Sequence, residues 1–142
     1  MKTYKKFFLY AIALLLTVGL GSFSCDDDEG SPVPETLASE LAGTWTATAL
    51  TVDGQPAGIN LGGFSMTLNV DAQNEASTYN VTFGSIPSFA SNSGSWSVTN
   101  SSLTLSNASF SFNGAPTSTQ MVFTFTDTND KTTPTYEITL TK

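Results

Sequence analysis

Apolar and polar residues alternate one by one along most of the chain from position 64 onward. Phe64, Met66 and Leu68, for example, are separated by Ser65 and Thr67. A period of two places successive side chains on opposite faces of a β-strand. The pattern predicts eight strands, at residues 44–52, 64–70, 79–83, 96–98, 103–105, 110–112, 121–125 and 136–140.

Turn-forming residues separate these strands, as at Asp53-Gly54 and in the segment 113–116. Eight sequential strands, each with one polar and one apolar face, favour an all-β, up-and-down antiparallel barrel, because closure removes exposed strand edges. A two-sheet β-sandwich has the same periodicity and stays open as the alternative. Ahead of the strands, Leu37 and Leu41 share one face of a short helix predicted over residues 35–41.

The predicted inward side chains are mostly large, and none of them carries a positive charge. Strands this short enclose little volume, so we expect a mostly filled interior with at most a shallow pocket at the mouth. A carboxylate buried without a cation would be costly. Any ligand of such a domain is therefore expected to be neutral or apolar.

The N-terminal segment has the order of a secretory signal. Three lysines lie within residues 1–6, an apolar run spans residues 7–20, and small residues lead to Ser24. Cys25 is the single cysteine of the chain, and with Ser24 it resembles the lipobox of bacterial lipoproteins, although Ser22 and Phe23 replace the commoner residues. We therefore expect residues 1–24 to be removed and Cys25 to carry a lipid. A plain secretory signal followed by a free thiol is the alternative.

An acidic block follows the cysteine: Asp26, Asp27, Asp28 and Glu29. It resembles the signal for export to the outer face in surface lipoproteins of the Bacteroidota type, which implies an outer-membrane protein displayed at the cell surface. The alternative is a solvated acidic spacer. Residues 25–36 are then a lipidated tether, and residues 37–142 form the barrel domain.

The charge of the expected mature chain limits its partners. Without residues 1–24, two lysines stand against twelve carboxylates, a formal charge of −10, and the chain has no arginine or histidine. Nucleic acid is not expected as a partner, because phosphate binding needs a basic surface. The membrane is expected to be held through the lipid alone, since no polybasic second signal exists. We expect a monomer.

Gly43 and Trp45, within residues 41–45, resemble the Gly-x-Trp motif that opens the first strand of lipocalin-like domains. The resemblance would cover residues 41–142. In that family the tryptophan plugs the closed end of the barrel, usually beneath an arginine from near the end of the chain. This sequence has no arginine, so that partner is missing. The alternative is that Trp45 is an ordinary core aromatic.

Two long loops at the predicted mouth contain apolar residues that the strand pattern does not explain: Ile59, Leu61, Ile86 and Phe89. Apolar residues around a barrel mouth are where ligands enter or partners dock. These four residues are therefore the candidate ligand or partner site. The alternative is that they fold back and cap the core.

Catalytic chemistry has little support in the sequence. Histidine-dependent mechanisms are impossible without histidine, and Cys25 is expected to be acylated. Most carboxylates of the domain lie in predicted turns, where turn formation explains them. We expect no enzyme, no cofactor and no metal site. The two hypotheses for function are a binding module for a small neutral or apolar ligand, and a protein-interaction or inhibitor module with a filled barrel acting through its loops.

Overall fold

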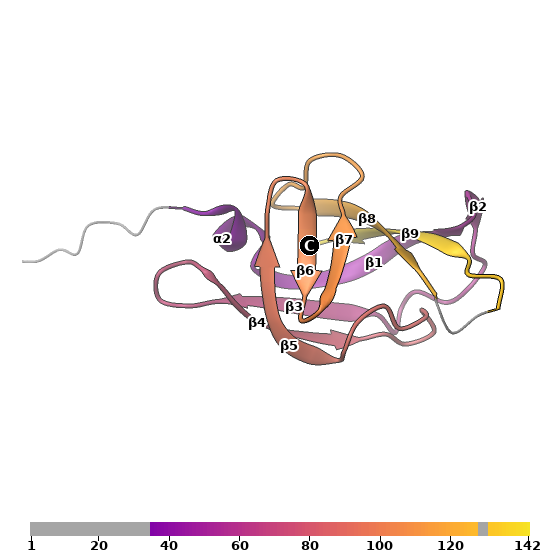
Figure 1. Cartoon of the computed structure of the whole chain (residues 1–142), viewed down its shortest axis with the longest axis horizontal. Coiled ribbons are helices and arrows are strands. Elements are labelled where there is room, and N and C mark those ends of the chain that lie inside the picture. Colours follow the sequence, from indigo (N-terminus) through magenta and orange to yellow (C-terminus); the bar gives the residue numbers. More distant parts are fainter. Residues whose placement is uncertain (1–34, 128–130) are drawn as a thin grey trace, which may run out of the picture. The chain divides into compact units, whose positions relative to one another are not determined.

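A computed structural model describes residues 35–127 and 131–142, which lie in one compact unit, Val33–Lys142. The expected signal segment, Cys25 and the block Asp26 to Glu29 lie outside the described residues. The elements are labelled in Figure 1: α2 (Leu37–Leu41), β1 (Gly43–Val52), β2 (Gln55–Pro56), β3 (Ser65–Val70), β4 (Ala76–Thr82), β5 (Ser93–Val98), β6 (Ser102–Leu105), β7 (Ala108–Ser111), β8 (Gln120–Thr126) and β9 (Thr135–Thr141).

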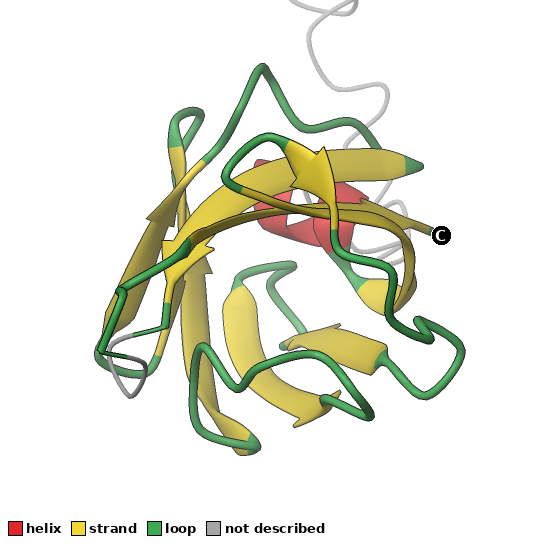
Figure 2. Cartoon of the chain, turned by 90° about the vertical axis from the view of Figure 1, so that its right-hand side faces the viewer, coloured by secondary structure: helices red, strands yellow, loops and turns green. Residues whose placement is uncertain are grey.

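The eight longer strands form one antiparallel sheet in the order β7-β6-β5-β4-β3-β1-β9-β8, and β2 pairs with β1 as a short hairpin. The sheet curls until its two outer strands meet at a single bridge, Phe112↔Phe123. Figure 2 views the result from the end opposite the helix, with the strands around a central interior. This nearly closed barrel confirms the predicted up-and-down fold, and the sandwich alternative was wrong.

The inward faces of the strands form a single apolar core. No polar or charged residue is buried within the part of the chain that the structure describes. Of the expected inward positions, Val70, Val98, Phe112 and Tyr136 are only half-buried. The buried hydrophobic residues that make up this core are Ala38, Leu41, Trp45, Leu50, Phe64, Met66, Leu68, Tyr79, Val81, Phe83, Ile86, Phe89, Trp96, Leu103, Leu105, Phe110, Met121, Phe123, Phe125, Ile138 and Leu140.

Strand β1 departs from strict alternation. Its pairing with β9 shifts by one residue between Ala47 and Ala49, as at a β-bulge. An extra residue reverses the side-chain phase beyond it. Trp45 and Leu50, five positions apart, are therefore both buried.

Helix α2 begins two residues later than predicted, because Thr36 acts as its N-cap. The Thr36 hydroxyl accepts the Ser39 N–H at 3.1 Å, and the Ser39 hydroxyl accepts the Thr36 N–H at 3.0 Å. This reciprocal capping satisfies two backbone donors that the helix leaves unpaired. The Thr36 hydroxyl also donates to the carbonyl of Asn74, which joins the helix to the β3–β4 turn. Among the described residues, no helix is both long and apolar enough to cross a membrane.

Candidate functional site

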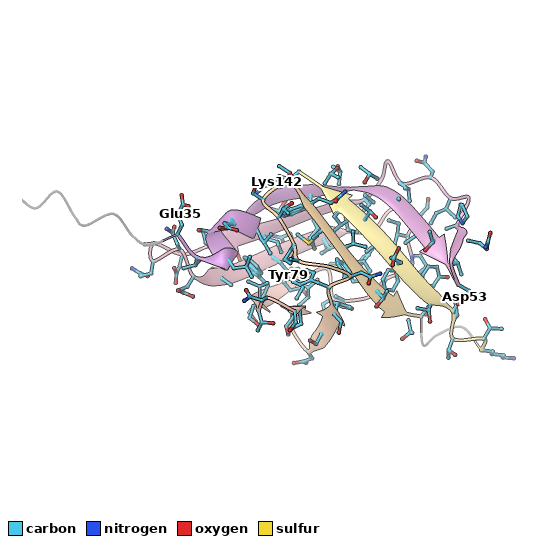
Figure 3. All side chains as sticks on the ribbon, turned by 90° about the horizontal axis from the view of Figure 1, so that it is seen from above. Glu35, Asp53, Tyr79 and Lys142 are labelled. Carbon is cyan, nitrogen blue, oxygen red and sulfur yellow. The ribbon has the colours of Figure 1, made fainter. Side chains whose placement is uncertain are left out.

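The two ends of the barrel differ in how they are closed. At one end, helix α2 is joined to the β3–β4 turn and to Lys142 at the end of β9. At the other end, the Thr135 N–H donates to the carboxylate of Asp53 at 3.0 Å. Figure 3 shows Glu35 and Asp53 at these opposite ends, with Tyr79 between them. We call the end with Glu35 the helix end and the end with Asp53 the mouth.

The side chain of Trp45 closes the helix end. It is fully buried, and its indole N–H donates to the carbonyl of Leu41 at 2.8 Å. That carbonyl is at the last residue of α2, where the helix leaves its carbonyls unpaired. One side chain thus seals the core and completes the helix terminus.

Lys142 occupies the place of the arginine that the lipocalin resemblance implies. Its ammonium lies 5.2 Å from the centroid of the Trp45 ring and donates to the carbonyls of Glu40 (2.9 Å) and Ala42 (2.7 Å). Gly43 has a φ of +124°, and a Cβ there would lie 3.0 Å from the Lys142 Cδ. Gly43 therefore allows the lysine stem to pass close over the backbone on its way to the tryptophan.

Replacing this lysine is expected to weaken the helix end. Lys142→Met removes two charged hydrogen bonds and the cation–π contact, and should lower the free energy of unfolding by about 1–2 kcal/mol. Urea denaturation followed by tryptophan fluorescence measures this loss. Lys142→Arg should retain most of the stability, and Lys131→Met, a change at an exposed loop lysine, is the matched control. Equal losses for the two Lys→Met variants would contradict the role of Lys142.

The four apolar loop residues predicted as a site do not share one surface. Ile59 is 37% exposed, and Leu61 is half-buried against the core. Ile86 and Phe89 are buried, as the capping alternative expects. Ligand or partner binding by any of the four residues stays a prediction.

Phe89 reaches from the β4–β5 loop into the middle of the barrel. Its ring centroid lies 4.7 Å from that of Phe125, 4.9 Å from Phe83, 5.3 Å from Phe110 and 5.4 Å from Phe123. Such edge-on and tilted arrangements are favourable for aromatic pairs. The mouth is thus plugged by a side chain of the protein itself, which agrees with the expectation of a mostly filled interior.

A cavity of about 460 Å³ lies beside this plug, between the outer strands β7 and β8. We call it the seam cleft. Its lining, among the residues that the structure describes, contains no ionisable side chain and consists of Phe89, Ala108, Ser109, Phe110, Ser111, Thr124, Phe125, Thr126 and Thr135. Sequence reasoning missed it, because alternation does not show where two strand edges separate. It is the candidate ligand site of the domain.

A second cavity, of about 580 Å³, lies at the helix end. Its lining is mainly polar and includes the carboxylates of Glu35 and Glu40, with Ser39, Pro116, Thr117 and Ser118. Two exposed carboxylates without a third ligating side chain are a weak basis for a metal site. Within residues 35–127 and 131–142, no three acidic, histidine or cysteine residues cluster to hold a metal ion.

An eight-stranded antiparallel barrel with a short helix and a tryptophan at one end defines a small calyx-type β-barrel. The family model for the lipocalin-like domain matches residues 41–142. The chain therefore belongs to the lipocalin-like domain family, which confirms the resemblance first seen at Gly43 and Trp45. Searches of the curated proteins and of the solved structures found no match.

Proposed function

We propose that this protein is a lipid-anchored surface lipoprotein whose lipocalin-like domain binds a small neutral or apolar ligand, and that it is not an enzyme. The observation that carries the binding function is an uncharged cavity, with an aromatic floor, in the wall of a lipocalin-like barrel. Sites for small molecules are typically concave, with polar groups that fix the ligand. The lining of this cavity is mainly polar, and its three phenylalanines lie largely buried beneath it.

Charge supports the choice of a neutral ligand. The described lining of the seam cleft offers no cation that could pair with an anionic ligand. Lys142 already donates to two carbonyls at the helix end, and Lys131 is exposed in the β8–β9 loop. A buried ligand carboxylate would therefore lose its hydration without gaining an ion pair.

The sequence supports the anchor. The signal-like residues 1–24, Cys25 and the acidic block Asp26 to Glu29 stand in the order of a surface-exported lipoprotein. The chain enters the barrel at the helix end, through Glu35 and Thr36. A lipid on Cys25 would therefore be linked to the barrel through the chain that enters at that end.

A protein-interaction module is the second candidate. Ile59 is the exposed large hydrophobic residue of the described chain, and it lies in the β2–β3 loop at the mouth. Exposed apolar side chains on loops can act as anchors for a partner protein. The aromatic filling around Phe89 also leaves little room for a ligand along the barrel axis.

Mass spectrometry of the protein extracted from the membranes of its own host tests both parts of the proposal. Under denaturing conditions we expect a chain that begins at Cys25 and carries the added mass of acyl chains. Under native conditions we expect a further mass that disappears on denaturation, which is the bound ligand. A Cys25→Ser variant should lack the acyl mass.

The outcomes separate the two parts. A chain without acyl mass would refute the anchor but leave the binding function intact. An acylated chain without any bound small molecule would refute ligand binding and favour the interaction module.

A further inference from the structure

The wall of the barrel is incomplete between β7 and β8. The two strands meet at the bridge Phe112↔Phe123, next to which the Asn113 N–H donates to the Val122 carbonyl at 2.7 Å. Toward the mouth, the described residues of β7 pair only with β6, and those of β8 only with β9. The seam cleft is the space that this separation leaves.

Backbone groups point into the cleft from both walls. In an antiparallel ladder, consecutive residues direct their N–H and C=O groups to opposite sides. The Phe112 N–H points toward β6, where it donates to the Ser101 carbonyl at 2.9 Å. Ser109 and Ser111 lie an odd number of residues before Phe112, so their backbone groups point the other way, toward β8. The Val122 carbonyl points toward β7, because it accepts the Asn113 N–H. Thr126 lies four residues further along β8, so its backbone groups point toward β7 as well.

Ser109 and Thr126 are thus the positions at which unpaired sheet edges face each other across the cleft. Unpaired strand edges bind whatever can supply complementary hydrogen bonds. Hydroxyl groups of Ser109, Ser111, Thr124, Thr126 and Thr135 add further donors and acceptors along the walls.

The floor of the cleft is aromatic. Phe89 lies between Phe110 of β7 and Phe125 of β8, with centroid distances of 5.3 and 4.7 Å. The volume of about 460 Å³ is within the range of typical small-molecule sites. The cleft therefore combines a largely buried aromatic floor with two polar, hydrogen-bonding walls, and none of its described lining residues is charged.

We propose that the ligand binds sideways through the seam cleft, across the barrel wall, and not along the barrel axis. The ligand class that fits is a neutral compound with aromatic rings and a carbonyl, amide or hydroxyl group. The rings pack on Phe89, Phe110 and Phe125, and the polar group binds the backbone of Ser109 or Thr126. This inference rests on the proposed ligand-binding function and assigns its site and ligand class.

The axial route is closed by the Phe89 ring, which occupies the interior below the mouth. A ligand that entered along the axis would have to displace this ring.

Photo-crosslinking with benzophenone tests the assignment, because this probe is neutral, has two aromatic rings and carries one carbonyl. The full, lipidated protein is irradiated with increasing benzophenone, and the adducts are located by peptide mass spectrometry. We expect saturable adducts in residues 108–111 and 124–126. Ser109→Trp and Thr126→Trp, which cover the cleft from either wall at exposed positions, should each lower the adduct yield about tenfold.

Thr82→Trp, at an exposed position on β4, is the matched control and should leave the yield unchanged. Saturable adducts in residues 57–63 that neither cleft variant reduces would overturn the seam cleft as the site but leave ligand binding intact. Adducts that never saturate, in any variant, would overturn the proposed ligand binding itself.

Discussion

Phe89→Ala is expected to lower the free energy of unfolding by about 3–5 kcal/mol, the range for truncating a buried phenylalanine. The Phe89 side chain comes from a loop, yet it is buried, with only 9% of its surface exposed. It packs against the rings of Phe83, directly after β4, Phe110 of β7 and Phe125 of β8. Its removal leaves a cavity that the surrounding strands, fixed by their pairing, cannot fill. Urea denaturation monitored by the fluorescence of the buried Trp45 and Trp96 measures the loss.

Ile59→Ala is the matched control, because Ile59 also lies in a mouth loop but is 37% exposed. Its expected loss is below about 1 kcal/mol. The cavity of Phe89→Ala should also bind benzene, since apolar cavities of this kind accept small apolar molecules. Saturating benzene should then raise the unfolding midpoint of the variant and not that of the parent chain. Similar losses at the two positions would show that Phe89 does not plug the barrel.

The strands and most of the core could be predicted from the sequence, because alternation is a local property. Phe64, Met66 and Leu68 are buried as the period of two requires. The bulge in β1 could not be predicted in this way. It is set by the register of β1 against β9, more than 80 positions away, and it brings Leu50 inward.

The candidate site depended on contacts that the sequence does not encode locally. Ile86 and Phe89 were identified as unexplained apolar residues, but their burial is decided by rings from distant strands. The seam cleft arises where β7 and β8, joined by an eight-residue connection at residues 112–119, separate toward the mouth. The role of Lys142 does not follow from the arginine that the family resemblance implies, although lysine carries the same charge over Trp45.

The backbones of Gly63 and Gly84 lie close together where the chain continues beyond the paired ends of β3 and β4. This close approach, called the glycine crossing here, gives the second large expected loss of stability. Gly84→Ala should lower the free energy of unfolding by about 2–4 kcal/mol, from two sources. Gly84 has a φ of +60°, where an alanine is strained, and its new Cβ would lie 2.7–2.8 Å from three backbone atoms of Gly63. Backbone cannot rotate away as a side chain can, so the β4–β5 loop must shift.

Gly58→Ala separates these two sources. Gly58 has nearly the same φ, +64°, but a Cβ there meets nothing within 4 Å. Its cost should therefore be the conformational strain alone, about 1–2 kcal/mol. The difference between the two variants, measured by urea denaturation, is the energy of the backbone contact. Equal costs would mean that the crossing has room for a methyl group.

The same pair of variants connects the crossing to the plug. The β4–β5 loop begins at the crossing and carries Phe89 five residues later. If the crossing holds this loop in place, Gly84→Ala should displace the Phe89 ring and Gly58→Ala should not. Near-ultraviolet circular dichroism reports the packing of aromatic rings, so its signal should fall in Gly84→Ala alone. An unchanged spectrum in both variants would mean that the position of Phe89 is fixed by the rings around it and not by the glycine crossing.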